Sequence, residues 1–311
     1  MTVNHQSILR NMKQAWLSYK PFWTVVCMGI LSIPLVIFGW LVFQRPPQTV
    51  TEKQLFQGIY YRREYRSQPR PIMLHVVSVN LAAKGIKVLV TPGNAHSPIW
   101  ETNARTTSEF LQEFKLQLAV NANFFYPFDE NTPWNSYPNS GDRVGVVGQA
   151  ISNGQEYSPP QEGWAVLCIM ADQRAQVLAS GKCPTGSAQA VAGSNVVVEN
   201  GQSIPAKQGD ADSDGNYSRT AVAVDKTGKK LWLIVVDDKQ WLYSEGVTLG
   251  ELAEIAIALG ADAALNLDGG GSTTLVTATP NGFQILNSPV HTKIPMHERP
   301  VANHLGFFAI P

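Results

Sequence analysis

Residues 21–43 form an apolar segment that contains no charged side chain and is dominated by Val, Ile, Leu, Phe and Trp. About 20 such residues cross the hydrocarbon core of a bilayer as one helix. Pro34 lies within the segment, and membrane helices tolerate proline. The segment therefore separates a short N-terminal part, residues 1–20, from a long C-terminal part that must fold on its own.

Charged residues on the two sides of this segment predict its orientation. Arg10, Lys13 and Lys20 precede it, and Arg45 follows it closely. The positive-inside rule then places the N-terminus in the cytoplasm and the rest of the chain outside. A cleaved signal peptide is an alternative, but its apolar core is usually 7–15 residues and residues 44–47 offer no small-residue cleavage site. We expect an uncleaved single-pass anchor; a buried helix of a soluble core is a third interpretation.

The remaining chain is typical of one domain that follows a linker. Residues 44–69 begin with Pro46-Pro47 and polar residues, which favour an extended linker, so we place the domain at residues 70–311. An apolar fraction of 44% permits a packed core. Lys plus Arg equals Asp plus Glu at 24 each, so no net charge favours nucleic acid as a partner. The sequence leaves the oligomeric state open.

Short apolar runs predict many strands and few helices. The segment Thr248-Leu-Gly-Glu251 is a capping box that opens a helix ending at Gly260. With its flanking strands this helix makes one crossover unit, whereas the other strand pairs resemble hairpins. We therefore expect an α+β fold with a mixed, largely antiparallel sheet and packed helices. The expected strands cover residues 72–80, 86–91, 118–125, 144–152, 164–170, 175–179, 191–199, 219–224, 230–236 and 263–267.

A turn near the C-terminus combines one carboxylate with three glycines. The strand at residues 263–267 ends on Asp268, which precedes Gly269, Gly270 and Gly271 and the hydroxyl residues Ser272 to Thr274. Glycine permits positive φ and close approach of another group. Successive N–H groups in such a turn can also form an anion-binding nest. The alternative is a simple strand–turn–strand connection, but three adjacent glycines weaken regular structure and favour a functional turn.

Two further segments carry polar residues that need an explanation. Asn121 and Asn123 lie on an expected buried strand, where asparagine is unfavourable without partners. They either belong to a site or cap the end of the strand. Residues 126–142 form a polar segment with Trp134 and Tyr137, which either covers a site and stacks on sugars or packs against the domain.

Two cysteines could form a disulfide, and the cysteines and one acidic segment could in principle bind a metal ion. Cys168 and Cys183 lie in the exported part and bracket an expected hairpin, so they either form a disulfide or remain two buried thiols. No CxxC spacing favours zinc. Asp210, Asp212 and Asp214 resemble the start of a calcium loop. The bidentate Glu at its twelfth position is missing, so we expect a solvated acidic loop and no cofactor.

Five short motifs follow one another along the chain: VNANFF at 120–125, RTAVA at 219–223, VVD at 235–237, LNLDGGGSTT at 265–274 and ERPVAN at 298–303. In this order they resemble the motifs of the phosphodiester glycosidase family, and the resemblance covers roughly residues 70–311. The family includes the enzyme that uncovers phospho-mannose tags and bacterial exported proteins linked to exopolysaccharide. This chain departs from the family pattern at Asn123, where the family often has Gly or Asp, and at Ala223, where it usually has Gly.

The resemblance implies hydrolysis of the glycosidic C–O bond of a sugar-1-phosphodiester in cell-envelope or exopolysaccharide material. Such chemistry needs a carboxylate as nucleophile or base, and our candidates are Asp268 first, then Asp237 and Glu298. The departing phosphate needs cations and N–H donors, for which we expect Arg219 and Arg299. The expected substrate-binding residues are Asn121, Asn123, Arg219, Thr220, Gly269, Gly270, Gly271, Ser272, Thr273 and Arg299.

Two other functions compete with this one. A non-catalytic protein on the same fold would hold an anionic glycan during export or assembly. A metal-dependent phosphodiesterase would break the P–O bond instead of the C–O bond.

Overall fold

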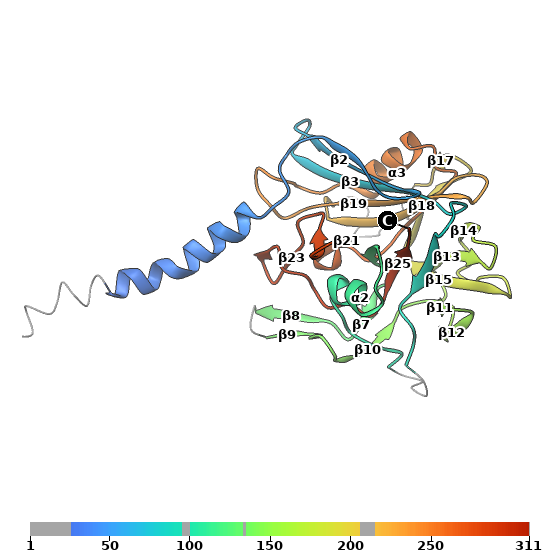
Figure 1. Ribbon diagram of the computed structural model, residues 1–311, viewed down its shortest axis with the longest axis horizontal. Coiled ribbons are helices and arrows are strands. Elements are labelled where there is room, and N and C mark those ends of the chain that lie inside the picture. The colour runs from blue at the N-terminus through green and yellow to red at the C-terminus, as the bar shows by residue number, and fades with distance from the viewer. Residues whose placement is uncertain (1–25, 95–99, 133–134, 206–214, 311) are drawn as a thin grey trace, which may run out of the picture. The chain divides into compact units, whose positions relative to one another are not determined.

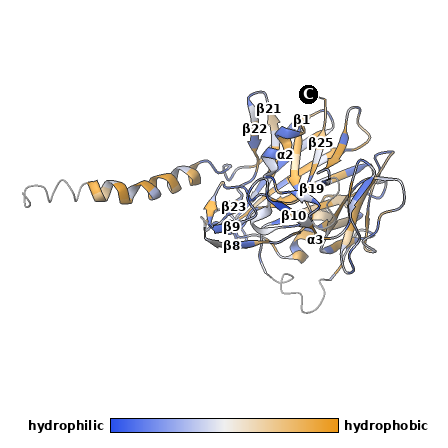
Figure 2. Cartoon of the chain, turned by 90° about the horizontal axis from the view of Figure 1, so that it is seen from below, coloured by the Kyte–Doolittle hydropathy of each residue, from blue (hydrophilic) through white to orange (hydrophobic). Residues whose placement is uncertain are grey.

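The computed structural model describes residues 26–94, 100–132, 135–205 and 215–310 (Figure 1). The chain divides into two units, residues 1–45 and 46–311. The described part of the first unit is one helix, Val26–Phe43, whose mean hydropathy is 2.4 and none of which is buried. Figure 2 shows this helix coloured mostly as hydrophobic. Its length and composition suffice to cross a membrane; residues 21–25 of the expected anchor lie outside the described residues.

The largest sheet of the second unit has eight strands, and each neighbouring pair is antiparallel. Helix α3 (Leu249–Ala258) packs against β16, β17 and β20, and the expected capping box between Thr248 and Glu251 is present. In spatial order the strands are β1 (Thr51–Phe56), β2 (Ile59–Arg66), β3 (Ile72–Asn80), β19 (Lys230–Val236), β18 (Arg219–Val224), β20 (Ala263–Asn266), β16 (Asn195–Glu199) and β17 (Gln202–Ser203).

Two five-stranded sheets complete most of the unit, and helix α2 (Thr107–Glu113) packs on β6 and β21. The first sheet has the order β22 (Gly282–Ile285), β21 (Leu275–Thr279), β6 (Leu118–Asn121), β25 (His304–Phe308) and β4 (Lys87–Val90). The second has the order β12 (Gln155–Ser158), β11 (Ala150–Ser152), β15 (Ser187–Gly193), β13 (Ala165–Met170) and β14 (Ala175–Leu178). The smaller sheets are β5 (Thr102–Asn103), β10 (Arg143–Val146) and β7 (Phe125–Tyr126); β8 (Asp129–Thr132) and β9 (Asn135–Tyr137); and β23 (Val290–His291) and β24 (Ile294–Pro295).

Alternating side chains of the eight-stranded sheet enter two different cores. On β19, Leu233 and Val235 join a core shared with the two five-stranded sheets. Ile234 and Val236 point to the opposite face and pack in a core with α3. Because successive strand residues face opposite sides, a sheet covered on both faces needs a continuous apolar run. The sequence Leu-Trp-Leu-Ile-Val-Val of β19 satisfies this requirement.

The observed architecture agrees with the α+β class in its coarse form, with strands at 44% and helices at 14% of the chain. The expectation of a mixed sheet is wrong for the described strands, because their pairings are antiparallel throughout. The crossover through α3 does connect β19 to β20, but β18 lies between them. β19 and β20, the two strands that this crossover connects, are therefore not paired with each other.

The domain also begins earlier than the sequence suggested. Residues 51–56 and 59–66, expected in the linker at 44–69, form β1 and β2 at the edge of the eight-stranded sheet. Ile59 and Tyr61 are buried in the core, while Tyr60 between them is exposed. Residues 59–65 alternate weakly in sequence, which also allows a first strand here, and β2 confirms that alternative.

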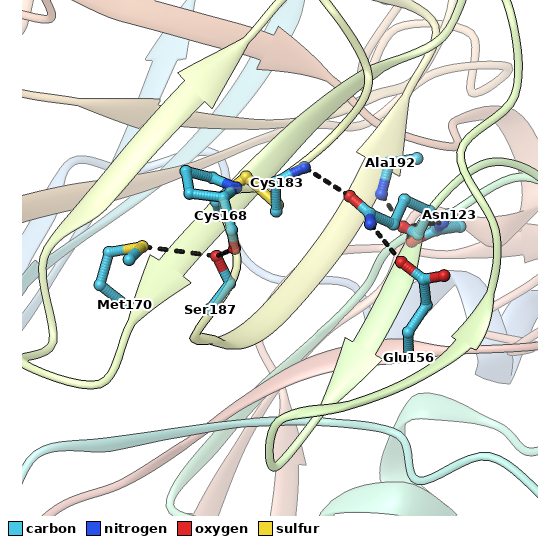
Figure 3. The surroundings of a disulfide bond; sticks show 9 residues. Asn123, Glu156, Cys168, Met170, Cys183, Ser187 and Ala192 are labelled. Carbon is cyan, nitrogen blue, oxygen red and sulfur yellow. Dashed lines mark hydrogen bonds between the residues drawn. A yellow bond between two sulfur atoms is a disulfide. The ribbon is translucent and has the colours of Figure 1, made fainter.

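Cys168 and Cys183 form a disulfide with a Cα–Cα distance of 5.6 Å (Figure 3). Cys168 lies on β13, and Cys183 follows β14. The Cys183 N–H donates to the Gln149 side chain at 2.7 Å, which brings the loop after β10 to the bridge. The disulfide therefore closes the β13–β14 hairpin onto the rest of its sheet.

Candidate active site

Asp268 lies directly beyond β20 and is almost buried, with 8% of its surface exposed. Burial raises the pKa of its carboxyl group to about 6. A hydrogen bond from Ser272, the positive charge of Arg299 and the Gly269 N–H all act against this rise in pKa. Asp268 is therefore a carboxylate whose protonation changes near neutral pH, as a catalytic acid or base requires.

Ser272 connects Asp268 to Arg299. The Arg299 Nη1 donates to the Ser272 Oγ at 3.2 Å, and the Ser272 hydroxyl in turn bonds the Asp268 carboxylate. This approach depends on Gly271, because a Cβ atom there would lie 2.4 Å from Arg299 Nη2. The glycine thus admits a cation beside the carboxylate, as its small size permits.

Three residues that we did not select from the sequence surround the Arg299 guanidinium. Its Nη2 donates to Glu130 Oε2 at 2.5 Å, and its Nε donates to His291 Nδ1 at 3.3 Å. The guanidinium carbon lies 4.3 Å from the centre of the Phe128 ring. Glu130 and Phe128 come from the segment 126–142. That segment therefore reaches the candidate site through Glu130, although Trp134, its most conspicuous aromatic residue, lies outside the described residues.

The second Glu130 carboxylate oxygen is also engaged. Its Oε1 accepts the Thr292 N–H at 2.6 Å. Burial and the charge of Arg299 lower the pKa of His291 to about 4, so its ring is neutral at pH 7 and Nδ1 can accept from Arg299. Glu130 is thus held by one guanidinium and one backbone N–H, a pair of donors that also suits a phosphate group.

A cleft of about 610 Å³ adjoins this network through His291. Its volume falls in the range typical of small-molecule sites. The start of α2 lines one side, and the segment that follows β24 lines another, including His297, whose ring lies 5.2 Å from that of His291. A second groove, of about 640 Å³, lies between the β13–β14 and β18–β19 turns and contains none of the candidate site residues. His291 and Glu298 line the first cleft, whereas Asp268, Ser272 and Arg299 do not, so this cleft borders the network and is the one nearest to it of the two.

Glu298 lines the cleft and accepts hydrogen bonds at the N-terminus of α2. Its carboxylate accepts the Ser108 N–H at 3.0 Å and the Ser108 hydroxyl at 2.5 Å. Burial raises the pKa of Glu298, and these hydrogen bonds act in the opposite direction. A carboxylate is favourable at a helix N-terminus, so the observed contacts give Glu298 a structural task.

Asp237 lies at the end of β19 and is only 1% exposed. Its Oδ1 accepts from the Asn287 side chain and from the Ser288 N–H, each at 2.9 Å. Its Oδ2 lies 3.1 Å from His75 Nε2, and the other ring nitrogen lies 2.8 Å from the Tyr61 hydroxyl. Asp237 does not line the cleft. These contacts instead tie residues 287–288, which precede β23, to the large sheet.

Asn121 and Thr220 hold the Asp268 turn from behind. The Asn121 Nδ2 donates to the Asp268 carbonyl at 2.6 Å. Its Oδ1 accepts the Thr274 N–H at 3.1 Å and the Thr220 hydroxyl at 2.9 Å. Asn121 and Thr220 are fully buried. Both were expected to bind substrate, but the structure uses their polar atoms to position the turn.

Asn123 plays a similar part at a different junction. Its Oδ1 accepts the Ala192 N–H at 3.0 Å and the Asn303 side chain at 2.9 Å, and its Nδ2 donates to the Val147 carbonyl at 3.0 Å. Figure 3 shows Asn123 beside Ala192, near the disulfide. Asn123, likewise expected to bind substrate, thus joins β6, β15 and the loop after β10.

Arg219 is buried at the start of β18 and faces a different set of groups from Arg299. Its Nε donates to the Val247 carbonyl and its Nη2 to the Gly215 carbonyl, each at 3.2 Å. The guanidinium carbon lies 5.1 Å from the centre of the Tyr217 ring. These contacts of Arg219 differ from those of Arg299, which joins the Asp268 network through Ser272.

The N–H groups of the glycine turn are largely used within the chain. Gly270 N donates to the Ser218 carbonyl at 3.0 Å, and Thr273 N donates to the Gly270 carbonyl at 3.2 Å. The Gly269 N–H bonds the Asp268 carboxylate. In this structure these two N–H groups are used within the chain, and the anion cradle stays a prediction. The side chain of Thr273 is also buried.

The acidic segment with Asp210, Asp212 and Asp214 lies outside the described residues. Among the residues that the structure does describe, no group of three or more His, Cys, Asp or Glu side chains is placed to hold a metal ion.

Comparisons with known proteins show which family and which solved structures this chain is similar to. A family model described as phosphodiester glycosidase matches residues 114–308. A search of curated proteins gave no match.

Three solved structures share the fold. The catalytic domain of zebrafish N-acetylglucosamine-1-phosphodiester alpha-N-acetylglucosaminidase, auto-inhibited by its pro-peptide, is 21% identical with a TM-score of 0.57; the match covers 86% of this chain and 84% of that one. A hypothetical protein from Synechocystis is 16% identical with a TM-score of 0.55, and the match covers 85% of this chain but only 64% of that one. A putative exported protein from Burkholderia pseudomallei is 13% identical with a TM-score of 0.56, covering 86% and 98%.

The family model spans more than half of the chain and includes Asn121, Arg219, Asp268 and Arg299. The similar structures are too distant in sequence to indicate more than the fold. The chain belongs to the phosphodiester glycosidase family.

Proposed function

We propose that this protein is a membrane-anchored hydrolase that cleaves the glycosidic C–O bond of a sugar-1-phosphodiester. Residues 21–43 would cross the membrane with the N-terminus in the cytoplasm, and the domain would lie outside. Its substrate would be cell-envelope or exopolysaccharide material. Family membership supports a glycosidase-type hydrolase, and the apolar helix Val26–Phe43 supports the anchor.

The observation that carries the proposal is the bonded sequence Asp268–Ser272–Arg299 beside a cleft of about 610 Å³. A carboxylate that attacks an anomeric carbon, or activates water to do so, must lie near the cation that receives the phosphate. Asp268 and Arg299 meet this requirement through one shared hydroxyl group. Opposite charges this close favour the ionised form of each, which keeps Asp268 available as a base above about pH 6.

The reaction breaks the bond between the anomeric carbon and the phosphate oxygen. Water supplies the oxygen of the new sugar hydroxyl, and the phosphate leaves as a monoester with the bonding electrons. This leaving group is a weak base, so a strong general acid is less important than cationic stabilisation. Arg299 supplies that cation. Asp237 and Glu298 stay candidates for the second carboxylate, although their observed contacts are structural.

Glu130 occupies the Arg299 and Thr292 donors that a phosphate would need. We infer that the substrate phosphate replaces the Glu130 carboxylate as it binds. Before the substrate binds, Glu130 would neutralise Arg299 and hold β8 against the Arg299 side chain.

Replacing Asp268 by Asn tests the proposal. With a UDP-sugar as substrate, we expect free sugar release to fall by about 10²- to 10⁴-fold, the usual effect of losing an acid–base group. The thermal unfolding transition should be retained, because Asn preserves the size of the side chain. Asp262→Asn, at the opposite end of β20, is the matched control and should keep its activity. Near-normal turnover by Asp268→Asn would show that this residue takes no part in the reaction. If the native protein binds glycan tightly but releases no sugar, the binding-protein alternative is favoured.

The Ser272 hydroxyl lowers the pKa of Asp268, so its removal should raise that pKa further. In the native enzyme, we expect kcat/KM to rise with pH through about 6 as Asp268 loses its proton. In Ser272→Ala, the rise should move to higher pH. Ser218→Ala is the control, because its hydroxyl bonds the Gly270 carbonyl in the same turn and not the carboxylate. Identical pH profiles for native enzyme and Ser272→Ala would show that Asp268 is not the group that titrates.

Replacing Glu130 by Gln should make Arg299 easier to reach for phosphate. We expect KM to fall by about tenfold, equivalent to ~1.4 kcal/mol, with little change in kcat. The control is Glu113→Gln, which removes an exposed carboxylate that pairs with Arg105 outside the cleft. A large fall in kcat for Glu130→Gln would instead make Glu130 a direct participant in the reaction and contradict its replacement by substrate.

A further inference from the structure

The turn at residues 240–244, between β19 and α3, presents two large apolar side chains to solvent. Trp241 is 82% exposed and Leu242 is 61% exposed. Leu242 also has a positive φ of 61°, which is uncommon for a bulky residue. Such a conformation persists only where its surroundings impose it, so the outward position of these side chains is part of the fold.

The turn is held firmly on both sides of its exposed tip. The Tyr243 and Ser244 N–H groups donate to the Gln240 carbonyl at 2.9 and 2.8 Å. The Gln240 side chain exchanges two hydrogen bonds with Ser288, and the Ser244 hydroxyl donates to the Asp237 carbonyl at 2.6 Å. Gln240, Tyr243 and Ser244 are all buried. Exposure of Trp241 and Leu242 therefore reflects a rigid platform, not a loose loop.

The first residues of the domain lie along this turn. The Gln48 Nε2 donates to the Leu242 carbonyl at 2.8 Å, and the Tyr243 hydroxyl donates to the Pro46 carbonyl at 2.9 Å. Val50, two residues beyond Gln48, is 64% exposed. Trp241, Leu242 and Val50 are thus exposed apolar residues within two positions of the bonds that join Pro46 and Gln48 to this turn; we call these three residues the apolar tip.

Chain length restricts how far this point can lie from the apolar helix. The helix ends at Phe43, three residues before Pro46. An extended chain spans at most about 3.6 Å per residue, so the two residues lie within about 11 Å of each other. If the helix crosses a bilayer, Pro46 must then emerge in or near the headgroup region. Tryptophan is enriched at that depth, because its ring is apolar and its N–H is polar.

We propose that the apolar tip contacts the interfacial region of the same bilayer that the helix crosses, and so holds the domain against the membrane. This inference rests on the anchoring in the proposed function. The turn also contacts the segment that leads to His291, through Gln240 and Ser288. The membrane contact would therefore be mechanically continuous with one wall of the cleft.

The full chain in phospholipid nanodiscs allows a direct test. In a Cys27→Ser background, which removes the free thiol of the described chain, a nitroxide label is attached at Leu242→Cys. We expect its collision rate with lipid-soluble oxygen, relative to that with a water-soluble nickel complex, to be severalfold higher than at Gln202→Cys. Gln202 is the control because it is exposed on β17, at the edge of the sheet opposite β1. Trp241→Cys should behave like Leu242→Cys and guards against misfolding of one variant.

A third label, at Ser32→Cys in the middle of the helix, tests the anchoring separately from the membrane contact of the apolar tip. A label at 242 as accessible to nickel as that at 202, with the label at 32 shielded in lipid, would overturn the membrane contact alone. That result would also be the one expected if the apolar tip binds a protein. A label at 32 that is itself accessible to nickel would overturn the anchoring, and the membrane contact with it.

Discussion

The hydrogen bonds of one buried amide determine where the candidate catalytic carboxylate can lie. Asn121, at the end of β6, bonds the carbonyl of Asp268, the N–H of Thr274 and the hydroxyl of Thr220. It therefore joins the turn after β20 to β18 and to the sheet that contains β6. Each bond to a buried group is costly to lose, because no water can replace it. These bonds fix the backbone at both ends of the glycine turn, at Asp268 and at Thr274, and Gly271 between them leaves room for Arg299.

Electrostatics then give the site its chemical character. Asp268 is buried, which favours its neutral form, but Ser272 and Arg299 favour the charged form. The balance leaves a carboxylate that can act near neutral pH, beside a cation suited to phosphate. Arg299 in turn lies between Glu130 and a neutral His291. In the proposed function, the Glu130 carboxylate neutralises Arg299 until the substrate phosphate takes its place.

Much of this arrangement follows from the sequence, but not the assignment of individual roles. The apolar runs of β18, β19 and β20 and the capping box of α3 predict their elements correctly, because each depends on local periodicity and capping. The same reasoning identified the turn after β20. It did not separate Arg219 from Arg299, which appear equivalent in sequence, because their different contacts come from residues that are distant in the chain, such as Val247 for Arg219 and Glu130 for Arg299. Glu130 escaped notice because nothing in a polar segment predicts which carboxylate folds back onto a distant arginine.

In the proposed reaction, this protein breaks the bond between the anomeric carbon and the phosphate oxygen. Hydrolysis of a sugar-1-phosphodiester in ¹⁸O-labelled water, followed by mass spectrometry of both products, tests it most directly. Cleavage of the C–O bond with water as the incoming group predicts that the label enters the sugar hydroxyl and not the phosphate. Label in the phosphate would mean P–O cleavage and would contradict the account.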